Sequence, residues 1–256
     1  ANQGAENDLV IYSLKKFFKL AADCNPNIIE ILFVDDEVII KSTELGERVR
    51  SLGPEFLSKK AYHTFSGYAH SQLQRIKSHR AWLLNPPQKR PEHTDFNLPN
   101  DKKLSSSEFG SLDHLVLDNV VLSEEIFTLF MREKQFRAAE ANWKQYESWK
   151  ANRNKDRAAL EAKFGYDTKH GMHLIRLMRM CREILSEHKV YVKRPDRDEL
   201  LSIRYGNYSF EQLIEESDKI NEACAALYKT STLQHEPNRK KLDSELVSIT
   251  EKFLSQ

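Results

Sequence analysis

The segment from residue 165 to 185 combines groups that could bind phosphate with an apolar helical stripe. At 100° per residue, Lys169, His173 and Arg176 share one helix face, because their spacing is i, i+4, i+7. Neighbouring positive charges repel each other, so this row adds nothing to the stability of the helix. It is either a solvated basic face or a row of donors directed at phosphate oxygens. The opposite face is predicted to be buried through Leu174, Leu177, Met178, Cys181 and Leu185.

A second long helix is predicted from residue 58 to 84. His63, His70 and Lys77 form a polar stripe on it, separate from the apolar positions. Two histidines at this spacing resemble a metal pair, but no carboxylate or third ligand lies near them in sequence, which disfavours zinc. Gly67 lies between the histidines and would allow the close approach of a ligand or of another helix.

Composition limits the classes of function. The 256 residues suffice for one large domain or two small ones, and the net charge of +1 leaves anion binding to a local patch. The 3 cysteines are far apart and form no CxxC motif, which suits a reducing compartment and predicts a cytoplasmic protein. No apolar run approaches the roughly 18 residues of a membrane span, so we expect no membrane partner. GxGxxG and GxxxxGK[ST] are absent, which argues against Rossmann and P-loop enzymes.

Apolar segments near the N-terminus predict a small amount of sheet. Asp8 leads directly into β-branched and aromatic residues, which favours a strand over 8–12. Asp35, Asp36 and Glu37 follow later, between two short apolar segments. A charged turn is favoured there over a metal site.

Helical patterns dominate the remainder of the chain. The proline-containing connection at 85–103 is either a functional loop or a strap across the surface. A helix is predicted to begin after Ser123, and another at Asp196, with Glu199 completing a capping box. One further strand is predicted at 189–193. The predicted fold class is therefore α+β and predominantly α.

Five separated blocks resemble one family of predicted nucleotidyltransferases. They are DLVIYSLKKFFKLAADCNPNIIEILF, FLSKKAYHTFSGYAHSQLQRI, HRAWLLNPPQKRP, GYDTKHGMHLIRLMRM and KRPDRDELLSIRYGNYSFEQL. The family belongs to the polymerase-beta superfamily, and one branch is known as the RNA-ligase-associated polymerase-beta-type transferases. The resemblance implies a nucleotidyltransferase palm followed by a helical domain. It also implies transfer of a nucleoside monophosphate from an NTP with Mg²⁺, with an RNA or tRNA end as acceptor.

The chain departs from the metal-binding pattern of that superfamily. Two metals in such an enzyme are held by three carboxylates, supplied by a Gly-Ser turn with an Asp-x-Asp pair and by an acid on a neighbouring strand. Only seven residues precede Asp8, and they contain no such turn or pair. Asp8 stands where the third acid would lie, so it is the candidate catalytic residue and metal ligand. The chain looks like a family member without the N-terminal palm segment, through truncation, a natural split or processing, or omission of the front.

The resemblance and the missing carboxylates leave two possible functions. With the front segment present, for example as a separate chain, Mg²⁺ could bind. Lys169, His173 and Arg176 would then face the triphosphate, and His63, His70 and Lys77 would form a second wall. The alternative is a catalytically inactive nucleotide-binding, RNA-binding or partner-binding module. The resemblance places the C-terminal part of a palm at 1–57 and a helical domain, with the extended loop, at 58–256.

Overall fold

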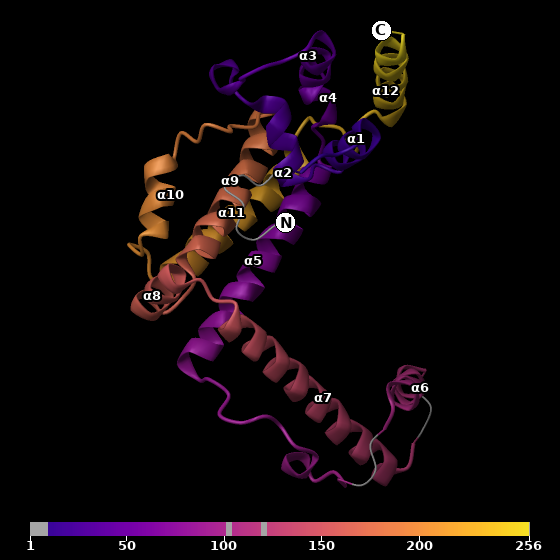
Figure 1. Cartoon of the computed structure of the whole chain (residues 1–256), viewed down its shortest axis with the longest axis vertical. Coiled ribbons are helices and arrows are strands. Elements are labelled where there is room, and N and C mark those ends of the chain that lie inside the picture. Colours follow the sequence, from indigo (N-terminus) through magenta and orange to yellow (C-terminus); the bar gives the residue numbers. More distant parts are fainter. Residues whose placement is uncertain (1–9, 101–103, 119–121, 256) are drawn as a thin grey trace. The chain divides into compact units, whose positions relative to one another are not determined.

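The computed structural model describes residues 10–100, 104–118 and 122–255 of the chain. Within these ranges every regular element is a helix and no strand is present (Figure 1). The predominantly helical prediction is confirmed, but the predicted remnant of a palm sheet is wrong for the described residues. Val10 and Ile11 are 64% and 84% exposed and lie in irregular backbone. An isolated extended segment without a neighbouring strand has no partner for its backbone groups, which explains why 10–12 and 189–193 remain irregular.

The chain divides into two compact units. Unit 1 comprises residues 1–80 and 160–256, and unit 2 comprises residues 81–159 between them. Unit 1 contains α1 (Leu14–Ala22), α2 (Pro26–Ile29), the short 3₁₀ helices η1 (Glu30–Phe33) and η2 (Asp36–Val38), α3 (Glu44–Ser51), α4 (Gly53–Phe56), most of α5 (Lys60–Leu84), α9 (Thr168–Glu187), α10 (Arg197–Arg204), α11 (Phe210–Thr230) and α12 (Arg239–Leu254). Unit 2 contains η3 (His93–Phe96), α6 (Ser106–Leu117), α7 (Glu124–Ala151) and the beginning of α8 (Lys155–Phe164). The boundary between palm and helical domain, predicted after residue 57, does not coincide with the ends of these units at residues 80 and 160. That boundary stays a prediction.

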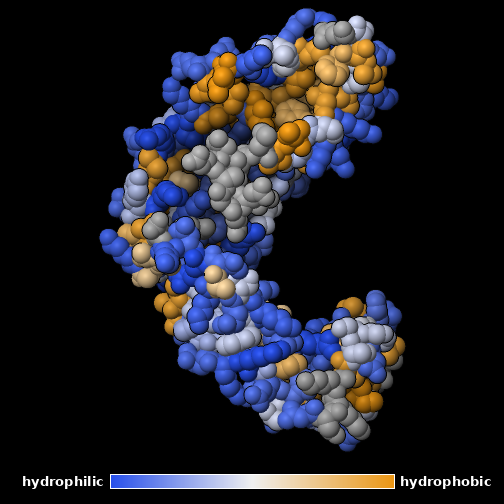
Figure 2. Space-filling model, in the orientation of Figure 1, coloured by the Kyte–Doolittle hydropathy of each residue, from blue (hydrophilic) through white to orange (hydrophobic). Residues whose placement is uncertain are grey.

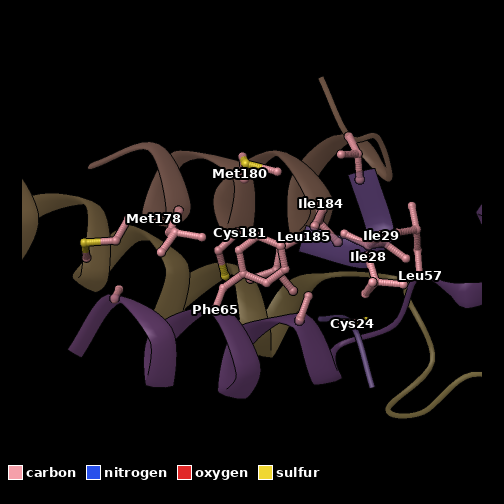
Figure 3. Packing of buried hydrophobic residues seen from close by; sticks show 14 of the residues in the cluster. Cys24, Ile28, Ile29, Leu57, Phe65, Met178, Met180, Cys181, Ile184 and Leu185 are labelled. Atoms are coloured by element: carbon pink, nitrogen blue, oxygen red, sulfur yellow. The ribbon is translucent and has the colours of Figure 1, made fainter. Parts of the chain in front are cut away.

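Helix α9 lies in the core of unit 1, where it packs along α11 and α10 (Figure 3). All members of its predicted apolar stripe are buried, from Leu174 to Leu185. Phe65 of α5 and Ile29 of α2 belong to the same core, so segments from both ends of the sequence enclose this helix. Gly171 permits the contact with α11, because a Cβ there would lie 2.9 Å from the Tyr166 ring and 3.1 Å from Leu213.

Unit 2 is built around α7. Its first turn is capped by Ser123, whose hydroxyl accepts from the Ile126 backbone N–H at 3.3 Å, as the sequence predicts. Phe130 is buried and stacks on Phe109 of α6, with ring centroids 5.2 Å apart. The connection predicted at 85–103 is irregular over its described residues except for η3. The only regular element in its described residues is η3, which is stabilised by a capping box of Glu92 and Asp95.

One face of unit 1 carries exposed apolar residues, visible where orange gathers over α1, α3 and α12 (Figure 2). We call it the apolar face. It is hollowed by two cavities of about 570 and 340 Å³, and both are lined by Leu14 and Val49. Phe253 of α12 lines the smaller cavity and is 66% exposed. None of the described helices is both long and apolar enough to cross a membrane.

Candidate functional site

The predicted phosphate-binding row lies on α9 as expected from its spacing. Asp167 caps this helix and accepts from the backbone N–H groups of Lys169 and His170 at 3.0 and 3.1 Å. Lys169, His173 and Arg176 then follow on a partly buried face. The row is thus positioned by a capped helix whose other side is fixed in the core.

Positive charge converges on His173. Burial lowers its pKa below the ordinary value of 6.5, and the nearby charges of Arg176, Lys169 and Arg204 lower it further. Arg204 belongs to the last turn of α10, so two helices contribute to this charge. His173 is therefore neutral at pH 7, and an anion placed beside it would be stabilised by the surrounding cations.

Arg176 is not a freely solvated side chain. Its guanidinium forms an ion pair with Glu30 of η1, and both side chains are mostly buried. The pair links the core helix to the N-terminal segment. Among the described residues Lys169 forms no ion pair, so within the row it is the cation with the least competition for a ligand.

His63 and His70 of the second predicted wall line two cavities of unit 1. His63 is exposed and lies 3.3 Å from the Tyr228 hydroxyl, at a cavity of about 410 Å³. His70 contacts Gln74 and lines another cavity of about 230 Å³. Neither of these cavities is lined by a member of the α9 row, and Lys77 is exposed outside both. Gly67 is exposed and approached by nothing within 4 Å, so no second helix packs there.

The carboxylates do not assemble a two-metal set in the described part of the chain. Asp8 lies outside the described residues. Asp36 pairs with Arg50 at 2.8 Å, and Glu37 faces Lys193 at 3.7 Å, so this acidic segment is an exposed, charge-paired turn. The described residues therefore do not fit the three-carboxylate arrangement that two Mg²⁺ ions require.

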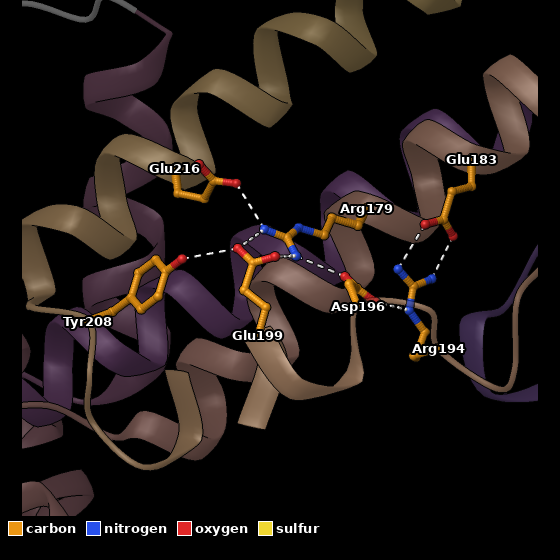
Figure 4. A network of polar contacts seen from close by, with 7 residues as sticks. All are labelled: Arg179, Glu183, Arg194, Asp196, Glu199, Tyr208 and Glu216. Atoms are coloured by element: carbon orange, nitrogen blue, oxygen red, sulfur yellow. Dashed lines mark hydrogen bonds and ion pairs between the residues drawn. The ribbon is translucent and has the colours of Figure 1, made fainter. Parts of the chain in front are cut away.

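A buried charged network on α9 has no counterpart in the sequence analysis (Figure 4). Arg179 is only 8% exposed at its side chain and contacts Asp196, Glu199 and Glu216 at 2.8, 2.7 and 3.1 Å. Arg194 joins Asp196 and Glu183 at 2.8 and 2.5 Å. The predicted capping box at Asp196 is wrong, because its side chain makes no cap hydrogen bond and serves this network instead. The available signal was the i, i+4 pair of opposite charges at positions 179 and 183, between apolar neighbours.

The same residues form the wall of a cavity of about 600 Å³. Every acid that faces Arg179 is already engaged by an arginine or by the Tyr208 hydroxyl, which donates to Glu199 at 3.0 Å. The arginine charges lower the pKa values of Glu199 and Asp196, although burial acts in the opposite direction. The network is thus a structural link between α9, α10 and α11, in which two arginines pair with four carboxylates.

One comparison with known proteins gives a match. Residues 2–84 match the family model RlaP, described as the RNA repair pathway DNA polymerase beta family. No curated protein and no solved structure matches the chain. The matched segment includes α1 to α5, and thus Glu30, the ion-pair partner of Arg176. The resemblance to a polymerase-beta-type nucleotidyltransferase family is therefore confirmed, and residues 2–84 carry it.

Proposed function

We propose that this chain takes part in transferring a nucleoside monophosphate from an NTP to an RNA or tRNA end, in the cytoplasm. The family match over residues 2–84 is the observation that carries this proposal, since it indicates a polymerase-beta-like role in RNA repair. The charge around His173 supports it, because a triphosphate is the kind of ligand that such a cluster of cations binds.

In this proposal the row on α9 binds the phosphates. Lys169 approaches as a point charge, while Arg176 exchanges or shares its contact with Glu30. Glu30 opposes anion binding, whereas the charges of Arg176, Lys169 and Arg204 near His173 favour it. His63, His70 and Lys77 are proposed as contacts to a longer substrate such as RNA, since they line separate parts of α5.

Asp8 is proposed as the carboxylate of this chain that binds Mg²⁺. The remaining carboxylates would come from a palm segment outside the 256 residues. The apolar face supports such a partner, because much of it lies within the matched segment yet is exposed. A protein surface with a contiguous apolar area commonly binds another protein.

The second candidate function is nucleotide or RNA binding without catalysis. It is favoured by the charge pairing of Asp36 and Glu37 with basic side chains, because these two carboxylates are then not available to bind Mg²⁺. Incubation of the chain with labelled NTPs, Mg²⁺ and RNA separates the two functions. We expect no transfer by the chain alone; transfer by the chain alone would contradict the need for a partner.

Three variants test the phosphate-binding row. Arg176→Ala is expected to weaken ATP binding by about tenfold to a hundredfold, the factor for one charge-assisted hydrogen bond. Glu30→Gln should strengthen ATP binding, because it releases Arg176 from its ion pair. Lys240→Ala, which removes an exposed lysine of α12, serves as the control and should leave the affinity unchanged. Titration calorimetry at two salt concentrations measures all three.

Melting temperatures distinguish binding from a purely structural role. If the ion pair between Arg176 and Glu30 is only structural, Arg176→Ala and Glu30→Gln lower the melting temperature to a similar extent. Both variants then bind ATP as tightly as the wild type does. That result would contradict the proposed role of the row. Opposite effects of the two variants on affinity would support it.

A further inference from the structure

Three potential metal ligands converge at the junction of α5, α8 and α9. One donor atom each from His79, Glu161 and Asp167 lies within 4.8 Å of the others. Glu161 and Asp167 are 3% and 2% exposed, and His79 is half-buried. The three residues are separated by up to 88 positions in sequence, from 79 to 167, so only the fold brings them together.

Two carboxylates this close and this buried require compensating positive charge. Like charges in a site of low dielectric constant disfavour each other's ionisation, and an ion that binds both removes that penalty. Each of the three side chains also makes a further interaction, so a bound cation would exchange with existing partners. The combination of imidazole nitrogen and carboxylate oxygen is a donor set typical of Zn²⁺ and other divalent transition metals.

His170 lies beside Asp167 and outside the group of three. Its Nδ1 lies 2.6 Å from the Gln72 amide oxygen, which can only accept, so Nδ1 carries the hydrogen. In the neutral ring Nε2 then presents its lone pair, and this atom lies 3.5 Å from Asp167 Oδ2.

The backbone holds these donors in place. Asp167 uses Oδ1 to cap α9, which directs Oδ2 towards His170. Gly165, at φ 75°, makes the turn into this cap, and its carbonyl accepts from Arg80 Nη1 at 2.9 Å. Arg80 follows His79 directly in α5. The hydrogen bond from Arg80 to Gly165 therefore also holds His79 close to the turn that leads to Asp167.

We propose that His79, Glu161 and Asp167 bind one divalent transition-metal ion, with Zn²⁺ as the probe. The ion would join the two places where the chain leaves and re-enters unit 1, at residues 80 and 160. The site shares α9 with the nucleotide-binding row, because Asp167 caps that helix, but zinc retention is measured without ATP.

The test measures zinc retained by the whole chain. After incubation with Zn²⁺ and extensive dialysis, elemental analysis should give about one zinc per wild-type chain, and visible absorption of the Co²⁺ form should report a nitrogen- and oxygen-ligated ion. Asp167→Asn keeps a residue that caps helices well but removes the charge, so folding is preserved. We expect it and His79→Ala to weaken Zn²⁺ binding at least tenfold.

His114→Ala is the matched control, since it removes an exposed histidine of α6. It should retain zinc as the wild type does. Zinc should also raise the melting temperature of the wild type and of His114→Ala, but not that of Asp167→Asn. Absence of stoichiometric zinc in the wild type, or equal retention by Asp167→Asn, would overturn the proposal.

Discussion

His173 is surrounded by cations from its own helix and from α10. Its lowered pKa follows first from burial and then from Arg176, Lys169 and Arg204. Such an imidazole responds to any anion that binds near it, because a negative charge restores the preference for the protonated form. The side chain can therefore report phosphate binding without contacting the phosphate itself.

We predict that ATP binding to the wild type tightens as pH falls. Proton uptake by His173 is easier in the complex than in the free protein, so affinity rises as pH falls from the higher pKa of the complex towards the lower pKa of the free protein. Each unit of difference between the two pKa values corresponds to about tenfold in affinity. Calorimetry between pH 8 and 5.5, in buffers of different ionisation enthalpy, measures both affinity and protons taken up.

The control is His173→Asn, which removes the titrating group and retains a polar side chain. Protonation of ATP itself affects wild type and variant alike, so the difference between their profiles isolates His173. Parallel profiles would mean that no phosphate lies near this side chain.

At the scale of elements, the approach of α9 to α11 depends on the absence of a side chain at position 171. Gly171 is buried within α9, where alanine would otherwise favour the helix by about 1 kcal/mol. A Cβ at this position would lie 2.9 Å from the ring of Tyr166, which is itself fully buried. Tyr166 cannot move easily, because its hydroxyl donates to the Tyr208 carbonyl at 2.9 Å.

Gly171→Ala is therefore expected to destabilise unit 1 by about 1–3 kcal/mol, the usual cost of overpacking. Gly67→Ala in α5 is the matched control, since nothing lies within 4 Å of its added Cβ, and it should stabilise the protein slightly. Urea unfolding of both variants measures the difference. A Gly171→Ala protein as stable as the wild type would show that α9 and α11 can separate without cost.

The elements were predictable where periodicity and capping agree. The buried stripe of α9 and the Ser123 cap of α7 follow from local spacing, and both are confirmed. The ion pair between Arg176 and Glu30 joins residues 146 positions apart, and no local pattern contains that information. Asp196 has the sequence of a helix cap, yet tertiary contacts with Arg179 and Arg194 displace that role. The prediction of a sheet was wrong for the described residues, because a segment with strand propensity forms a strand only when a second strand pairs with it.

At the scale of the whole molecule, each compact unit has its own buried residues. Phe130 belongs to unit 2, and Leu174 belongs to unit 1. Only α5 and α8 continue from one unit into the other. Local unfolding can therefore occur in units of this size.

We predict two calorimetric transitions that respond to different variants. Phe130→Ala should lower the transition of unit 2 by about 3–5 kcal/mol of stability, and Leu174→Ala should lower that of unit 1 by about 2–5 kcal/mol. Scanning calorimetry of both variants and of the wild type checks this. A single transition that both variants lower equally would mean that the continuous helix α5 couples the units.

The interruption of unit 1 by unit 2 has a consequence during synthesis on the ribosome. When residue 80 has been made, α9 and α11 do not yet exist, and the apolar side chains of Phe65 and Ile29 have no core to enter. At about 5–20 residues per second, the intervening segment delays that core by roughly 4–16 s. Unit 2 is complete before unit 1, so residues 1–80 lack the partners of their core while unit 2 is made and can already fold.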